Sequence, residues 1–126
     1  MRSMWVRVCI GVGLAELLPI LVLVAVVAVN GPNDATAAQA YAERMGRWVG
    51  PIAGPLCVLG LSYWAFQPRQ TSQLQAGLLF GAGAVALDVG LLVLAGAPFD
   101  WLFVAANTAR LAAGATGGFL VRSSAD

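Results

Sequence analysis

Four long apolar segments, separated by turn-forming residues, constrain this chain more than any other feature of its sequence. A helix rises about 1.5 Å per residue, so about 20 residues span the roughly 30 Å hydrocarbon core of a bilayer. Backbone groups in lipid must be hydrogen-bonded within the segment, and this requirement favours helices. The sequence therefore predicts an all-α membrane protein, a four-transmembrane-helix bundle that forms a single domain over residues 1–126. The predicted spans are residues 8–29, 48–66, 74–95 and 101–121.

The composition agrees with lipid as the solvent for most of the surface. Hydrophobic residues make up 60% of the chain and charged residues 10%, against about 45–50% and about 25% in soluble globular proteins. A soluble protein of this size has a large surface relative to its volume and needs polar side chains to cover it. Seven basic and six acidic residues are too few to provide that cover.

Charge and residue types also exclude several classes of function. The net charge is +1 and no basic patch is present, so we expect no nucleic-acid partner. Histidine is absent, which removes the common ligands of haem and zinc and histidine-based acid–base catalysis. Cys9 and Cys57 lie in apolar segments, and we expect small buried side chains rather than a disulfide or a metal pair. We therefore expect no cofactor and no metal.

Turn-forming residues predict where the helices end. They lie at residues 30–34, 67–70 and 96–98, each rich in Gly, Pro, Asn or Gln. Ser72 stands three residues before Gln75, which is the spacing of a capping box for the third helix. Asp100 is suited to cap the start of the fourth helix.

The connection over residues 33–47 is the longest piece between two spans. From Ala35 to Met45 it is rich in alanine, a strong helix former. Tyr41, Met45 and Trp48 share one helical face, which is typical of an amphipathic helix at a membrane surface. We predict a short interfacial helix here, with an outward extension of the second transmembrane helix as the alternative. Whether it is a lid, a docking site or a plain connector stays open.

The arginines predict an orientation for the bundle. In a four-span chain, Arg2, Arg7, Arg69 and Arg122 fall on one side, and Arg44 and Arg47 on the other. Basic loops stay in the cytoplasm, so both termini are predicted to be cytoplasmic. Every basic residue is Arg, and Ala, Gly and Val are abundant, which is typical of a GC-rich bacterial genome. We therefore expect the inner (cytoplasmic) membrane.

Small residues at helical spacing indicate close contacts between helices. No hydrophobic effect drives helices together in lipid, and small residues let their backbones approach. The candidate packing residues are Gly46, Gly50, Gly54, Gly77, Gly81, Gly114 and Gly117. This pattern does not separate contacts within one chain from contacts between chains, so we expect a homo-oligomer or assembly with other membrane subunits. Pro19 and Pro55 predict kinks within the first and second helices.

Three ionisable residues lie near the middle of predicted spans: Glu16, Asp88 and Arg110. A charge at the bilayer centre costs at least about 2.5–3.5 kcal/mol, so these side chains should face inward and meet partners. Asp88 is ten residues and Arg110 twelve residues from Pro98, an offset of about 3 Å along antiparallel helices. We predict an Asp88–Arg110 ion pair within an intramembrane polar cluster that also contains Glu16 and Asn107.

Glu16 has more than one possible role in such a cluster. Two acids share one base, so full ionisation leaves a net negative charge in low-dielectric surroundings. Glu16 would then titrate, as a proton-coupled transporter requires. Alternatively, Glu16 is neutral and hydrogen-bonded, or completes a structural network around Arg110.

Two functional hypotheses follow for the whole chain. The leading one is a non-catalytic accessory or assembly subunit, held by the network of Glu, Asp and Arg. The alternative is a small oligomeric proton- or ion-coupled transporter, with Glu16 as the titrating carboxyl. An enzyme would need Asp88 and Glu16 as acid–base carboxylates, and helical spacing alone gives no support for that role. We therefore expect no catalytic residue.

Overall fold

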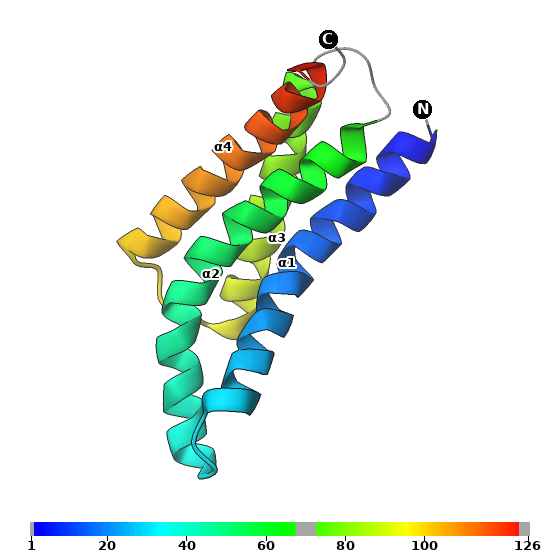
Figure 1. Cartoon of the computed structure of the whole chain (residues 1–126). Coiled ribbons are helices and arrows are strands. Elements are labelled where there is room, and N and C mark those ends of the chain that lie inside the picture. Colours follow the sequence, from blue (N-terminus) through cyan, green and yellow to red (C-terminus); the bar gives the residue numbers. More distant parts are fainter. Residues whose placement is uncertain (1, 68–72, 124–126) are drawn as a thin grey trace.

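The computed structural model describes residues 2–67 and 73–123, and the side chains of 3–67 and 73–121 within them. This part of the chain forms four helices joined by short connections (Figure 1). They are α1 (Arg2–Asn30), α2 (Ala35–Phe66), α3 (Leu74–Ala95) and α4 (Trp101–Ser123). The start of α1 and the end of α4 lie at one end of the bundle, and the α1–α2 connection lies at the other (Figure 1).

Three of these helices are long and apolar enough to cross a membrane, which is consistent with a membrane protein. They are Ser3–Asn30 within α1, all of α2 and all of α3. α4 has 23 residues, a sufficient length at about 1.5 Å per residue, but its sequence is more polar. Two of its hydroxyls are paired within the helix, because Thr108 donates to the Val104 carbonyl at 2.9 Å and Thr116 to the Ala112 carbonyl at 2.7 Å.

The prediction of a separate interfacial helix is wrong, because α2 runs without a break from Ala35 to Phe66. Asp34 caps the start of α2 by accepting a hydrogen bond from the Ala37 N–H at 2.9 Å. Residues 35–47 follow this cap as the first turns of α2. No proline stands between Ala35 and Pro51 to stop the helix there. The structure therefore has the alternative arrangement, an outward extension of the second helix.

Prolines within α1 and α2 accompany bends in both helices. Pro19 lies inside α1, and Pro51 and Pro55 lie inside α2. Proline has no N–H for the carbonyl four residues earlier, and its ring displaces that carbonyl. Both helices change direction midway along their length (Figure 1).

α3 has the predicted bounds, and α4 starts at the predicted residue. Gly96 ends α3 with a left-handed backbone (φ 66°) and donates its N–H to the Val93 carbonyl at 3.2 Å. Glycine adopts this conformation without the steric cost of a Cβ. Asp100 accepts a hydrogen bond from the Phe103 N–H at 3.1 Å, which confirms the predicted cap of α4. Ser72 lies outside the described residues.

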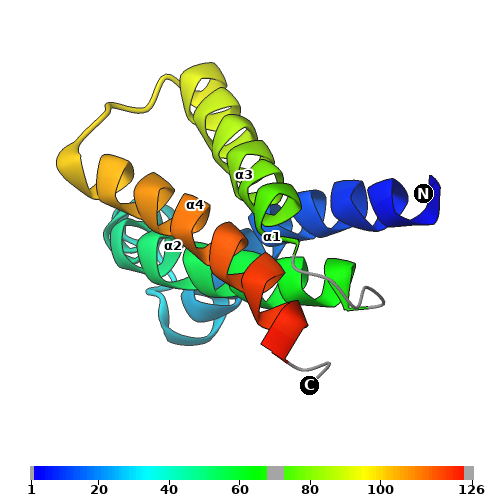
Figure 2. The ribbon, with the colours of Figure 1, turned by 90° about the horizontal axis from the view of Figure 1, so that it is seen from above.

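Buried residues are confined to one half of the bundle. Among the described residues they end at Pro19 in α1 and at Ala84 in α3, and they begin at Gly54 in α2 and at Ala106 in α4. We call this part the closed half. The remainder, which carries the α1–α2 and α3–α4 connections, is the open half. Viewed from above, α3 and α4 diverge toward the connection that joins them (Figure 2).

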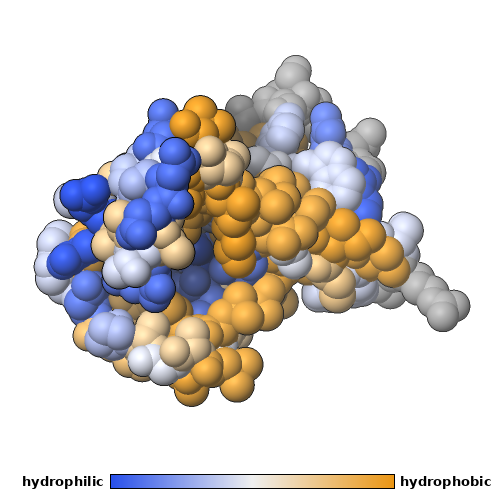
Figure 3. All heavy atoms as spheres, turned by 90° about the horizontal axis from the view of Figure 1, so that it is seen from below, coloured by the Kyte–Doolittle hydropathy of each residue, from blue (hydrophilic) through white to orange (hydrophobic). Residues whose placement is uncertain are grey.

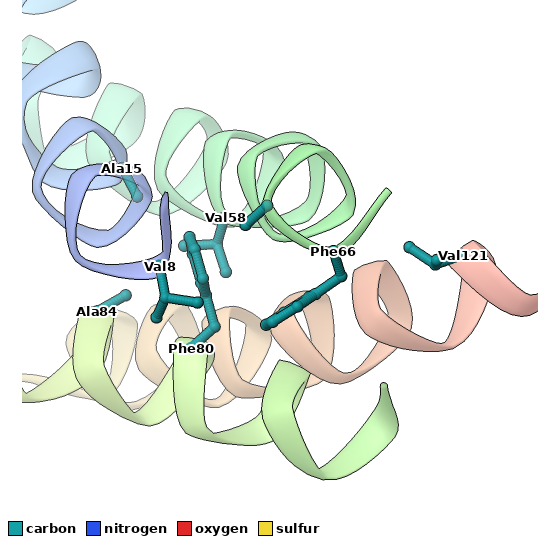
Figure 4. Packing of buried hydrophobic residues seen from close by; sticks show 8 residues of the cluster. Val8, Ala15, Val58, Phe66, Phe80, Ala84 and Val121 are labelled. Atoms are coloured by element: carbon teal, nitrogen blue, oxygen red, sulfur yellow. The ribbon is translucent and has the colours of Figure 1, made fainter. Parts of the chain in front are cut away.

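Apolar side chains fill the closed half. Phe80 of α3 reaches across between Val8 of α1 and Val58 of α2 (Figure 4). Its ring meets the Phe66 ring edge to face, with 6.4 Å between centroids. Beside this core Arg7 links α1 to α2, because it donates to the Trp64 carbonyl at 2.9 Å and lies 4.5 Å from the centre of the Trp64 ring.

Glycines hold α3 and α4 at backbone contact in the closed half. A Cβ at Gly77 would press on the Gly114 carbonyl, and a Cβ at Gly81 would lie 2.9 Å from the carbonyl oxygen of Arg110. Gly117 of α4 contacts α2 rather than α3, at Leu59 and Ser62. This close contact positions the middle of α4 against the middle of α3.

Two other candidate packing glycines lie in the open half. A Cβ at Gly46 would lie 3.2 Å from the Leu23 side chain, and a Cβ at Gly50 would have no heavy atom within 4 Å. Gly50 therefore does not pack against another helix within this chain.

We predict that Gly77→Ala destabilises the protein, whereas Gly90→Ala on the same helix does not. The new methyl group at residue 77 would force α3 and α4 apart, at a cost of about 1–3 kcal/mol. A Cβ at Gly90 meets nothing within 4 Å, and alanine is the better helix former by about 1 kcal/mol. Thermal unfolding in detergent would measure both. Equal unfolding temperatures for the two variants would contradict the backbone contact at Gly77.

Candidate functional site

Arg110 of α4 lies between two carboxyl groups from two other helices. Its Nη1 is 2.8 Å from Asp88 Oδ1 on α3 and 3.2 Å from Glu16 Oε1 on α1. The exposed fractions of the side chains are 5% for Arg110, 7% for Glu16 and 19% for Asp88. We call these three residues the charge cluster. Because one guanidinium touches both acids, the cluster ties together three helices.

Asn107, one turn before Arg110, fixes the second oxygen of Asp88. Its Nδ2 donates to Asp88 Oδ2 at 3.1 Å and to the Phe103 carbonyl at 3.0 Å. Asp88 therefore has one oxygen on Arg110 and the other on Asn107, and both partners come from α4. The carboxyl of Glu16 has less support, because its Oε1 contacts Arg110 but accepts no hydrogen bond in the structure.

The remaining helix, α2, contributes a glycine to the charge cluster rather than a charged side chain. The guanidinium of Arg110 lies directly over Gly54 of α2, where a built Cβ would be 2.6 Å from Nη2 and 2.7 Å from Nε. Any side chain at this position would push Arg110 away from its carboxylates. The sequence predicts Gly54 only as a packing residue. Its position near the middle of the predicted second span, at a depth similar to that of Arg110, is the one sequence feature that indicates its contact with Arg110.

The charge cluster has more acids than bases. If all three groups ionise, two carboxylates face one guanidinium, and the excess negative charge lies among buried residues, where charge is costly. Both carboxyls contact the same nitrogen, Arg110 Nη1. A single proton on either of them removes the excess charge, and the protonated carboxyl also gains an O–H donor.

Two cavities meet at the charge cluster from the open half. One of about 270 Å³ runs between α1 and α3 and reaches Glu16, Asp88 and Arg110. The other, of about 220 Å³, runs between α2, α3 and α4 and reaches Asp88 and Arg110. Both also border Gly46 and Gly50, which explains why Gly50 has no packing partner. Viewed from this end, hydrophilic atoms lie set back in a hollow beside hydrophobic ones (Figure 3).

A second, exposed ion pair stands on the wall of the smaller cavity. Arg47 of α2 and Asp100, which caps α4, both line it and lie 3.8 Å apart. The helical spacing of Glu43 and Arg47 favours a pair between those two, but Glu43 instead accepts from Gln39 Nε2 at 3.4 Å. The role of Asp100 at this cavity was not predicted, because only the folded chain brings α2 beside the α3–α4 connection.

Ser62 and the two cysteines lie apart from the charge cluster. The Ser62 hydroxyl donates to the Leu59 carbonyl at 3.1 Å and packs in the closed half, so it does not line either cavity. Cys9 is exposed and Cys57 is half-buried, and both are free. The expectation of a buried Cys9 is therefore wrong, because the face of α1 that carries it points out of the bundle.

Comparison with protein-family models, with curated protein sequences and with solved structures gave no match to this chain.

We predict that Arg110→Ala strongly reduces the yield of folded protein, and that adding Asp88→Asn restores part of it. Removing one partner of a buried ion pair leaves an uncompensated charge, at a cost of about 3–5 kcal/mol. Neutralising Asp88 removes much of that cost. The monodisperse fraction in size-exclusion chromatography after detergent extraction would measure it, with Arg44→Ala as an exposed control. Equal yields from the single and double variants would show that the pairing does not matter for folding.

Proposed function

We propose that this chain is a small proton-coupled membrane transporter whose solute enters the open half. The observation that carries the proposal is the place of the charge cluster. It lies at the inner end of two cavities, and the half of the bundle beyond it is filled by the apolar core around Phe80. Transporters of this general kind bind at mid-depth and admit solute from one side at a time.

The composition of the charge cluster supports coupling to protons. The cluster is neutral overall when Glu16 and Asp88 share one proton, and it has one excess negative charge when they do not. Besides Asp88, the charged group in contact with Glu16 among the described residues is Arg110 of α4, and the Cys57 thiol of α2 is close enough to be influenced by the charges of Glu16 and Arg110. We propose Glu16 as the carboxyl that gains and loses the proton, because both carboxyls contact Arg110 but only Asp88 also accepts a hydrogen bond from Asn107.

We propose that all four helices cross the inner membrane, with both termini in the cytoplasm. α4 can join the three more apolar helices because Arg110 faces the interior and is paired there. Arg7 lies in the closed half, and Arg44 and Arg47 lie in the open half. The side chains of Arg2, Arg69 and Arg122 lie outside the described residues. In this orientation the open half faces away from the cytoplasm.

The functional form in this proposal is a homo-oligomer. Gly13 and Gly60 are exposed, and a Cβ on either of them would meet nothing within 4 Å. Such positions allow a helix of another copy to approach closely.

A second candidate, the accessory or assembly subunit, is favoured by the exposed end of α3. After Ala84 no residue of α3 is fully buried, and Leu91, Val93 and Leu94 are exposed. A helix of a different membrane protein would cover this face and fill the open half. In that case the charge cluster would only fix the register of the helices.

The transporter proposal predicts that proton movement in proteoliposomes depends on an added solute and on Glu16. Small cations, anions, zwitterions and neutral solutes would be added one at a time while a dye trapped inside reports pH. We expect at least one class to move protons with the wild-type protein and none to do so with Glu16→Gln, because glutamine cannot carry the proton.

The matched control is Glu43→Gln, which removes the same charge from an exposed position on α2 and should leave the signal unchanged. An unchanged signal in Glu16→Gln would refute the role of Glu16. If no solute moves protons and a foreign membrane protein co-purifies at a fixed ratio in mild detergent, the accessory subunit is the better description.

A further inference from the structure

The cavity between α1 and α3 has the chemistry of a binding site for a small organic cation. We infer that the solute of the open half is a primary ammonium ion with a short apolar body. This inference rests on the proposed function and adds the class of solute to it. Three features of the cavity support it: its walls, its charge, and the hydrogen-bonding groups at its inner end.

The walls of this cavity are apolar along most of their length. Pro19, Ile20 and Leu23 line it from α1, and Leu91, Leu92 and Ala95 line it from α3. The ionisable side chains are confined to one end, where Glu16, Asp88 and Arg110 lie. A ligand that fits this arrangement has a charged group at one end and an aliphatic body at the other.

The charge at the inner end favours a cation. Arg110 Nε and Nη1 donate no hydrogen bond in the structure, but the positive charge of Arg110 is already met by two carboxylates at 2.8 and 3.2 Å, which repel an anion. The two carboxylates together exceed Arg110 by one negative charge. One monovalent cation restores neutrality, as one proton does. An ammonium ion and a proton are therefore alternatives at the charge cluster.

The hydrogen-bonding groups favour a cation with N–H donors over a quaternary one. Glu16 Oε1 contacts Arg110 Nη1 at 3.2 Å but accepts no hydrogen bond, and the Glu16 side chain is only 7% exposed. A buried acceptor without a donor is costly. A primary ammonium group supplies three N–H donors, whereas a quaternary ammonium group supplies none.

The volume limits the size of the solute. The cavity measures about 270 Å³, just below the range of about 300–1,000 Å³ for small-molecule sites. The body of the solute should therefore be a short aliphatic chain rather than a polycyclic or branched one.

Two isomeric cations provide a matched test. n-Butylammonium and tetramethylammonium have the same formula and charge, but only the first has N–H donors and a linear apolar body. Binding of radiolabelled n-butylammonium would be measured at neutral pH to the full chain in nanodiscs of zwitterionic lipid, with empty nanodiscs subtracted. Unlabelled tetramethylammonium, n-butanol and butyrate would be tested as competitors.

We expect saturable binding of n-butylammonium and no competition by the other three compounds at equal concentration. Glu16→Gln should weaken the binding at least about tenfold, since a hydrogen bond to a charged group is lost. Glu43→Gln should bind like the wild type. Circular dichroism and size exclusion would establish that Glu16→Gln is folded before it is compared.

Several outcomes would overturn the inference. Equal competition by tetramethylammonium would show that N–H donors are not required, and equal competition by n-butanol would show that charge is not. If n-butylammonium does not bind but another solute drives proton movement in proteoliposomes, the ammonium inference fails and the transporter proposal stands. If n-butylammonium binds but no solute drives proton movement, the transporter proposal fails and the assignment of the cavity to an ammonium ion stands.

Discussion

The contact of Arg110 with Glu16 and Asp88 is the interaction on which the rest of the structure depends. One guanidinium, 5% exposed, meets carboxyls from α1 and α3 and lies over Gly54 of α2. All four helices therefore converge on one side chain. In a nonpolar solvent a buried charge without a partner is costly, so this contact restricts the rotation and depth at which each helix can pack.

The charge cluster also divides the bundle into two unlike halves. In the closed half Phe80 fills the space between α1 and α2, and glycines hold α3 against α4. In the open half α3 has no fully buried residue after Ala84 among those described, and two cavities lead to the charges. The closed half is tightly packed, and the open half gives a solute access to the charge cluster. This difference is the physical basis of the transport proposal.

Local sequence signals predicted much of the helical architecture. Gly96 and Asp100 marked the end of α3 and the start of α4, since a left-handed backbone and a cap require such residues. The depth of Asp88 and Arg110 followed from the fixed rise of a helix. The predicted start of α2 is wrong, because the amphipathic pattern before Trp48 is also typical of a separate interfacial helix, whereas Asp34 caps one continuous helix.

Features that depend on tertiary placement were harder to predict. Which face of α1 turns inward is set by contacts with α2 and α3, so the direct contact of Glu16 with Arg110 was only one of several possibilities. The contact of Arg110 with Gly54 and the ion pair of Arg47 with Asp100 join segments far apart in the sequence. No periodicity within one helix encodes the rotation of its neighbours.

One-sided access to the charge cluster is the central claim, and thiol accessibility tests it most directly. Leu92 borders both cavities, whereas Ala84, two turns earlier on α3, is buried in the closed half. Each would be replaced by cysteine in a Cys9→Ala, Cys57→Ala background and treated in sealed vesicles with a membrane-impermeant thiol reagent. We predict that Leu92→Cys reacts from the side of the α1–α2 connection and that Ala84→Cys reacts from neither side. Reaction of Ala84→Cys, or none at Leu92→Cys, would contradict the division of the bundle into a closed and an open half.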